Sequence, residues 1–159
     1  MLKKLANRTH LVRALGVMHK SLTKRVIRLT QIRWGILSTP WREAFSLAWE
    51  ALREGSIPIG AVVASSDDVV LSKGRNAIGK AESDWPLSGH ELAHAEFNAL
   101  VNLKEWQKPD IYSYRIYTTV EPCPMCMGAI YMSGVRNIAF ASRDPWAGST
   151  NLLGTTPYL

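Results

Sequence analysis

The sequence predicts an α/β protein, a three-layer α/β/α sandwich built on a mixed sheet. The composition is globular, because 47% of the 159 residues are apolar and 20% are charged. No run of about 18 apolar residues occurs, which excludes a membrane span of that kind. Along the chain, the hydrophobic patterns follow the order helix, strand, strand, helix, strand, helix, strand. This order predicts a sheet with helices on its faces.

The first helix of this order is predicted over about residues 40–54. Thr39 is a good N-cap, Pro40 is favoured at the first helical position, and Gly55 suits the C-terminal end. One face of this helix would carry apolar side chains, which we expect to pack on the sheet: Phe45, Ala48, Trp49 and Leu52.

The remaining elements follow from short apolar runs separated by turn residues. Ile59–Ala64 is a buried-strand pattern, residues 65–68 form a turn, and a second strand begins at Val69, so the two strands predict a hairpin. We further expect a helix over about 93–103, a strand over 114–119, a helix from Pro122 to just before Gly134, and a strand over 137–141. Everything after Ala141 is predicted to be loop.

The formal net charge of +6 is unevenly distributed. Residues 1–40 contain nine Lys and Arg and no acid, while residues 41–159 contain ten basic and thirteen acidic residues, a net charge of −3. Leucines, methionine and valine between Leu11 and Leu29 recur at spacings of three and four, the stripe of an amphipathic helix. We therefore expect residues 1–39 to be a basic amphipathic extension and residues 40–159 to be the functional domain.

Three interpretations of the extension remain open. An acid-free, Arg-rich amphipathic start is typical of organelle transit peptides. Basic amphipathic helices also bind anionic membranes or nucleic acid. The third interpretation is a dispensable extension.

Two segments carry residues typical of zinc chemistry. His94–Glu96 and Pro122–Cys126 together match H-x-E followed by P-C-x-x-C, the signature of zinc deaminases. A catalytic zinc takes three protein ligands, for which His94, Cys123 and Cys126 are the candidates, and keeps one position for water. We expect one zinc per chain, a zinc-bound hydroxide that attacks a ring carbon bearing an amine, and Glu96 as the proton shuttle.

The spacing of these residues constrains where a metal could sit. Residues i and i+2 lie about 200° apart around a helix, so His94 and Glu96 reach one metal only near the helix N-terminal end. Pro122 likewise predicts a helix start beside the two cysteines, and helix N-termini favour thiolates. We infer two helix N-termini that converge on one zinc.

Other interpretations use the same residues. A C-x-x-C pair alone is also a redox motif. His90–His94 matches H-E-x-x-H, a zinc protease motif in which Glu91 would be the general base. A zinc-binding domain without activity is a further alternative. The protease interpretation would leave Cys123 and Cys126 without a purpose.

On these motifs, the chain resembles the zinc-dependent cytidine/deoxycytidylate deaminase superfamily. It is most similar to the branch of the tRNA adenosine, guanine and cytosine deaminases. The matching stretches are residues 57–63, Gly74–Asn76, His94–Glu96, 117–130 and Arg143–Asp144. The resemblance implies the cytidine-deaminase-like α/β/α sandwich, a homodimer, substrate contacts by Asn76, and a base pocket lined near Gly60 and Ala61.

The chain departs from the family pattern at both ends. The basic extension is not part of the pattern, and the strand and helix that usually follow the last predicted strand are apparently missing. A missing helix would uncover one face of the sheet, and we consider the amphipathic stripe between Leu11 and Leu29 as a substitute cover.

The residues leave the deaminated base open. The Pro122–Tyr131 run most resembles guanine deaminases, whereas Pro58–Val62 and Arg143–Asp144 resemble tRNA adenosine deaminases. The acidic body favours a free base or nucleoside over tRNA, because phosphate binding needs a basic surface. Trp85 and Trp146 are candidate pocket walls. Reduced cysteines that hold zinc predict a reducing, cytoplasmic compartment, with organelle targeting as the alternative.

Overall fold

The structure is a computed structural model in which residues 34–79 and 84–155 are described. The chain divides into two units, residues 1–37 and 38–159. The predicted amphipathic helix between Leu11 and Leu29 lies outside the described residues. The second unit contains the sheet and the helices that pack on it. None of its described helices combines the length and apolar character that a membrane crossing requires.

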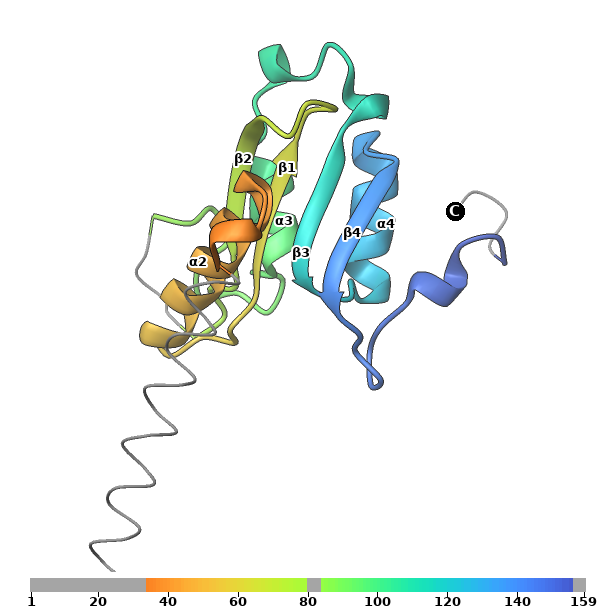
Figure 1. Ribbon diagram of the computed structural model, residues 1–159. Helices are drawn as coiled ribbons and strands as arrows, with labels where there is room; N and C mark the ends of the chain where they lie inside the picture. Colours follow the sequence, from red (N-terminus) through yellow and green to blue (C-terminus); the bar gives the residue numbers. More distant parts are fainter. Residues whose placement is uncertain (1–33, 80–83, 156–159) are drawn as a thin grey trace, which may run out of the picture. The chain divides into compact units, whose positions relative to one another are not determined.

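A four-stranded mixed sheet forms the centre of this unit (Figure 1). Its strands are β1 (Gly60–Ala64), β2 (Val70–Arg75), β3 (Arg115–Val120) and β4 (Asn137–Ser142), in the order β2-β1-β3-β4. β1 pairs antiparallel with β2 and with β3, whereas β3 and β4 are parallel. The predicted hairpin is therefore confirmed.

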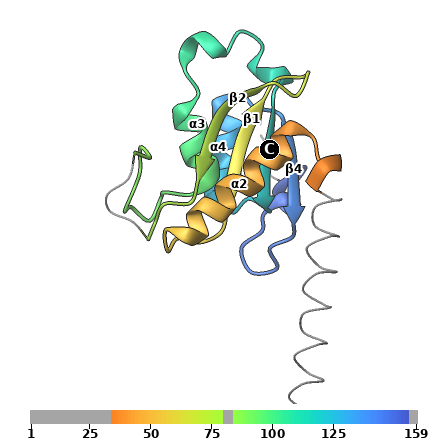
Figure 2. The same cartoon turned by 60° about the vertical axis from the view of Figure 1, so that its left-hand side comes forward.

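Helices cover both faces of the sheet, as Figures 1 and 2 show. α2 (Thr39–Arg53) lies on one face, and α3 (Ala95–Asn102) and α4 (Pro124–Ser133) lie on the other. Alternate residues of β1 separate accordingly, because successive side chains of a strand point to opposite faces. Val62 packs in a cluster with Leu47 of α2, and Val63 packs in a cluster with Ile130 of α4. The predicted three-layer sandwich is confirmed.

Two glycines let the helices approach the sheet closely. A Cβ built on Gly60 would lie 2.7 Å from Ala48 N in α2, and one built on Gly74 would lie 2.8 Å from Asn98 C in α3. Real Cβ atoms are not found this close to backbone atoms, so neither position accepts a larger side chain without moving a helix. The position of α3, which begins directly after His94, therefore depends on Gly74.

Side-chain amides also tie α3 and the turn after it to β2, the edge strand. Three amides donate to alternate carbonyls of that strand: Asn98 Nδ2 to Arg75 O at 2.9 Å, Asn102 Nδ2 to Lys73 O at 3.0 Å, and Gln107 Nε2 to Leu71 O at 2.8 Å. These bonds satisfy carbonyls that an edge strand would otherwise offer to another chain. They also set the register of α3 against the sheet.

The structure corrects several predicted boundaries and one predicted face. α4 begins at Pro124 rather than Pro122, because Cys123 is its N-cap in an extended conformation. Three short 3-10 helices occur that the patterns did not predict, at Glu105–Gln107, Ile111–Ser113 and Thr150–Leu152. Trp49 and Leu52, both predicted to pack on the sheet, are 61% and 48% exposed. The small residues of α2 face the sheet instead and let the helix approach it.

Candidate metal centre and active site

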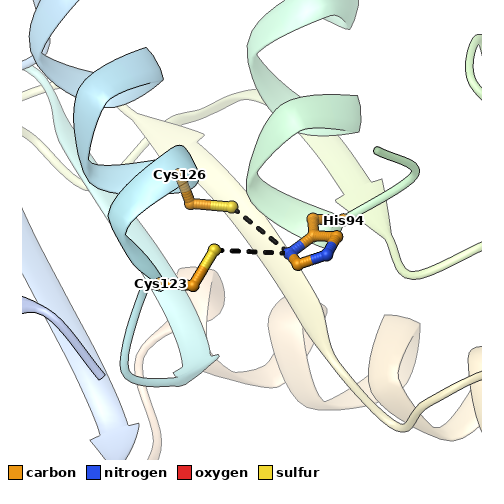
Figure 3. A group of neighbouring side chains, drawn as sticks. All are labelled: His94, Cys123 and Cys126. Atoms are coloured by element: carbon orange, nitrogen blue, oxygen red, sulfur yellow. Dashed lines mark hydrogen bonds between the residues drawn. The ribbon is translucent and has the colours of Figure 1, made fainter. Parts of the chain in front are cut away.

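Three side chains with metal-binding chemistry meet where α3 and α4 begin (Figure 3). His94 is the N-cap residue of α3, Cys123 is the N-cap residue of α4, and Cys126 lies in the first turn of α4. His94 Nδ1 is 3.7 Å from Cys123 Sγ and 3.5 Å from Cys126 Sγ. The expected convergence of two helix N-termini is therefore present, although the α4 terminus lies two residues later than predicted.

These separations fit a tetrahedral zinc. With bonds of about 2.3 Å to sulfur and about 2.0–2.1 Å to nitrogen, a tetrahedral zinc holds a sulfur and a nitrogen about 3.6 Å apart. Both observed distances, 3.7 and 3.5 Å, lie within a tenth of an ångström of that figure. Within residues 34–79 and 84–155, no other group of three His, Cys, Asp or Glu side chains is arranged for a metal.

The three side chains of the cluster shift one another's pKa values. The hydrogen bond from the Cys126 thiol, assisted by His94, lowers the pKa of Cys123 to about 4. The hydrogen bond to Cys123 raises the pKa of His94. The hydrogen bond between Cys126 and Cys123, together with burial, raises the pKa of Cys126. A bound metal ion would deprotonate both sulfurs.

Glu96 lies beside this cluster and is 4% exposed. Its Oε1 accepts a hydrogen bond from Thr118 Oγ1 of β3 at 3.0 Å, and its Oε2 lies 3.5 Å from Cys126 Sγ. Burial raises the pKa of the Glu96 carboxyl above its ordinary value. A buried carboxyl with a raised pKa is suited to accept and return a proton near neutral pH.

Two members of the metal-type cluster (His94, Cys123 and Cys126), namely His94 and Cys123, open with Glu96 onto a cavity of about 220 Å³. Apolar side chains, among them Ile59 and Val120, form part of its lining. Asn76 also lines it and is 1% exposed. Asn76 Oδ1 accepts a hydrogen bond from Ile78 N at 3.2 Å, but its Nδ2 has no partner. A buried unpaired donor is costly, which makes Asn76 a candidate ligand contact.

Not every residue expected at the site lines this cavity. Gly60 and Ala61 are not among its lining residues, although their neighbour Ile59 is. Gly60 faces α2, and Ala61 belongs to the core on the opposite face of the sheet. Trp146 lines the cavity as expected, whereas Trp85 packs against the α2-side core and stacks with Arg75.

The loop after β4 and Glu121 form another wall of the cavity. The zinc-deaminase motif did not reveal a role for Glu121. Asp144, Trp146 and Ala147 of this loop line the cavity, and so does Glu121. The Thr150 hydroxyl, followed by the Thr150 and Asp144 amides, holds the pKa of Glu121 below its ordinary value. Such hydrogen bonds between distant segments have no local sequence signal.

The alternative motif H-E-x-x-H does not form a site. His90 lies in a turn before α3 rather than on the helix, its side chain is 59% exposed, and its Nδ1 accepts a hydrogen bond from Leu92 N at 3.1 Å. His90 is not in the metal-type cluster. The zinc-protease interpretation, which needs His90 and His94 on one helical face, is therefore wrong.

Comparisons with known proteins agree with this geometry. Residues 37–142 match the family model described as the cytidine and deoxycytidylate deaminase zinc-binding region. The chain belongs to this deaminase family. The expected zinc cofactor is therefore confirmed, and the His94, Cys123 and Cys126 cluster is positioned for the metal ion.

Relatives of this deaminase-family chain differ in substrate. A cytosine deaminase from Candida albicans is 34% identical over 110 residues, which is 69% of either chain. A tRNA-specific adenosine deaminase from Bacillus subtilis is 31% identical over 116 residues, which is 70% of this chain and 65% of its own. The chain spans only 20% and 17% of the matching tRNA(Ile)-lysidine synthases from Deinococcus deserti and Deinococcus radiodurans.

Solved structures of this family share the fold. One comes from a study of A-to-I editing by tRNA:A34 deaminases, with 25% identity and a TM-score of 0.64 over 76% of this chain and 85% of that one. The guanine deaminase from Bacillus subtilis has 26% identity and a TM-score of 0.54 over 76% of this chain and 69% of its own.

Proposed function

We propose that this chain is a hydrolytic deaminase that removes the exocyclic amine of a nucleobase or nucleoside. One observation carries the proposal. His94 and Cys123 line one small cavity together with the buried carboxyl of Glu96, and Cys126 completes the cluster that fits zinc. Metal ligands and a proton carrier around one cavity are what the hydrolysis of a ring-bound amine requires.

The proposed roles divide between the metal ligands and the proton carrier. Zinc held by His94, Cys123 and Cys126 would supply a Lewis acid that makes water nucleophilic near neutral pH. Glu96 accepts one proton of the attacking water and delivers it to a ring nitrogen. It then takes the second proton from the newly added hydroxyl and passes it to the amine, so that ammonia leaves and a carbonyl remains. Thr118 holds Oε1 of Glu96, which leaves the carboxyl in one orientation for these transfers.

Substrate binding is assigned to the remaining lining residues. We propose that Asn76 Nδ2, the unpaired donor, hydrogen-bonds an acceptor atom of the base or sugar. The apolar side chains of Ile59 and Val120 line the space for the ring. The cavity is smaller than the roughly 300–1,000 Å³ of sites for drug-sized ligands, which favours a single ring system inside it. Gly60 and Ala61 stay predicted contacts, through backbone near Ile59.

The charges at the cavity favour an unphosphorylated substrate. Among the described lining residues no lysine or arginine occurs, while Glu121 and Asp144 add two carboxylates to the proton carrier Glu96. A phosphate at this position would need cationic partners. A free base or a nucleoside therefore fits better than a nucleotide, and guanine, cytosine and adenine types are all candidates.

A second candidate is a tRNA-specific adenosine deaminase. The fold of this chain superposes on 85% of the chain from the tRNA:A34 deaminase study, with a TM-score of 0.64. In this alternative, the target base enters the same cavity and the nine basic residues of the first forty would contribute to phosphate binding.

An ammonia-release assay on the full zinc-loaded chain tests these proposals. The panel contains guanine, cytosine, adenine, their nucleosides, and tRNA. We expect turnover of one free base or nucleoside. Turnover of tRNA alone would instead support the second candidate. No turnover of any member, with zinc bound, would contradict both and favour a zinc-binding domain without activity.

Three further expectations stay predictions. We propose that residues 40–159 form the deaminase domain and that residues 1–39 are an extension outside it. A homodimer is expected from the family resemblance, and light scattering of the purified chain would test it. A cytoplasmic compartment is expected from the reduced cysteines.

A further inference from the structure

The loop after β4, here called the wall loop (residues 143–150), is held internally by Asp144. Asp144 Oδ1 accepts hydrogen bonds from Trp146 N at 2.9 Å and Ala147 N at 3.2 Å, and Asp144 O accepts one from Gly148 N at 2.9 Å. These local bonds shape a compact turn. They do not determine where the turn lies relative to the cavity, because all of them join residues of the loop itself.

The carboxylate of Glu121 attaches the wall loop to the rest of the domain. Glu121 is 7% exposed and precedes the metal-type cysteine Cys123 by two residues. Its Oε2 accepts a hydrogen bond from Asp144 N at 3.2 Å, and its Oε1 accepts one from Thr150 N at 3.1 Å and another from the Thr150 hydroxyl. One side chain thus binds both ends of the loop.

Two neighbouring features support this attachment. Pro122 O accepts hydrogen bonds from Ser149 N at 3.0 Å and Ser149 Oγ at 2.8 Å. Gly148 passes directly over the carboxylate, since a Cβ built on it would lie 2.5 Å from Glu121 Oε2. The segment that delivers Cys123 to the cluster therefore also sets the position of the wall loop.

We propose that Glu121 is a positioning residue that holds the wall loop, with Trp146 and Asp144, as a substrate-contacting wall in fixed register with the metal cluster. This inference rests on the proposed deaminase function for its kinetic consequence. His94, Glu96, Cys123 and Cys126 come from the starts of α3 and α4, not from the wall loop. Loss of the wall should therefore weaken substrate binding more than the chemical step.

Glu121→Gln tests the proposal on the full zinc-loaded chain. The glutamine keeps one acceptor oxygen but places an amide donor against a backbone N–H of the loop, so one hydrogen bond becomes a donor–donor repulsion. For the panel member that the wild type turns over, we expect KM to rise about tenfold while kcat changes less than about threefold. The zinc content should stay at the wild-type value.

Hydrogen exchange provides a readout that needs no substrate. Residues 144–152 should exchange at least about tenfold faster in Glu121→Gln than in the wild type, because Asp144 N and Thr150 N lose their shared acceptor. Glu105→Gln is the matched control, since the same change is made on a carboxylate that is 90% exposed on a 3-10 helix elsewhere. It should leave exchange and KM at wild-type values.

Thr150 offers a conservative pair that separates hydrogen bonding from packing. Thr150→Ser keeps the hydroxyl that donates to Glu121 and should resemble the wild type, whereas Thr150→Val keeps the volume, removes the donor and should share the Glu121→Gln phenotype.

The outcomes separate this inference from the proposed function. If the wild type deaminates no panel member, the proposed function fails, yet hydrogen exchange still decides whether Glu121 holds the wall loop. Unchanged exchange of residues 144–152 in Glu121→Gln would overturn the inference. So would a variant that only melts at a lower temperature with KM unaltered, because that result describes a purely structural residue.

Discussion

At the scale of single residues, the chemistry depends on buried polar groups. Glu96 is a buried carboxyl that accepts hydrogen bonds from Thr118 Oγ1 and Cys126 Sγ. Asn76 keeps an unpaired donor at the cavity. A buried carboxyl and a buried unpaired donor each lower the free energy of unfolding, so such groups are retained most readily at functional sites.

We expect Glu96→Ala to keep about one zinc per chain and to lose deaminase activity by at least about a hundredfold, the range of a lost general acid–base group. The three metal-type side chains are untouched by this change, so zinc content measured by atomic spectroscopy should equal that of the wild type. Ammonia release reports the activity. Loss of the zinc, or survival of activity, would show that Glu96 has another role.

The two histidines of the H-E-x-x-H sequence give a matched pair. His94→Ala should lose the zinc, because His94 Nδ1 is the nitrogen donor between the two sulfurs. His90→Ala should keep the zinc, because His90 is 59% exposed and lies outside the cluster. Zinc stoichiometry of the two purified variants is the measurement, and a zinc-free His90→Ala protein would contradict the assignment.

At the scale of elements, the site depends on where two helices begin. His94 and Cys123 are N-cap residues, so their positions depend on how α3 and α4 pack on the sheet. α3 is positioned by its contact with Gly74 and by the amides of Asn98 and Asn102 along β2. Changes at these remote contacts should therefore shift the position of His94 in the metal cluster.

Gly74→Ala should lower the free energy of unfolding by about 1–3 kcal/mol, the usual cost of overpacking a core contact. The added methyl group would meet backbone atoms of α3, which cannot turn away as a flexible side chain could. Gly128→Ala is the control, because a Cβ there meets nothing within 4 Å and alanine favours a helix by up to about 1 kcal/mol. Urea unfolding of both variants measures the effect, and equal midpoints would contradict it.

At the scale of the whole molecule, the family match and the charge distribution divide the chain at similar places. The match begins at residue 37, and the acid-free segment covers residues 1–40. Within the folded unit, the cluster joins α3 to α4 on the same face of the sheet. Zinc should therefore link two segments that lie about thirty residues apart in the chain.

Removal of zinc should lower the melting temperature of the whole domain. A ligand that binds only the native state at a hundred times its Kd stabilises that state by about 2.7 kcal/mol. Calorimetry before and after chelation, with zinc added back, measures the shift. Protons compete for the sulfurs and the imidazole, so the shift should shrink as the pH falls. An identical melting temperature after verified zinc loss would contradict this role.

The local pattern of the sequence was sufficient for the order of the elements and for the residues that carry chemistry. Proline, glycine and capping residues act within one turn, so the starts of α2 and α4 could be predicted to within two residues. The packing face of α2 could not, because apolar residues occur on several sides of that helix. Trp49 is exposed, and the smaller Ala44 and Ala51 are buried.

Only the tertiary structure decided how distant segments meet. Spacing along the chain links residues within about four positions, whereas Cys123 and Cys126 lie 29 and 32 residues after His94. The choice between H-x-E with C-x-x-C and H-E-x-x-H therefore needed the measured separations and the exposure of His90. The hydrogen bonds from the wall loop to Glu121 likewise join residues that lie far apart in the sequence. By itself, the sequence determined which chemical groups are present, and the packing of the sheet and its helices decided which of them act together.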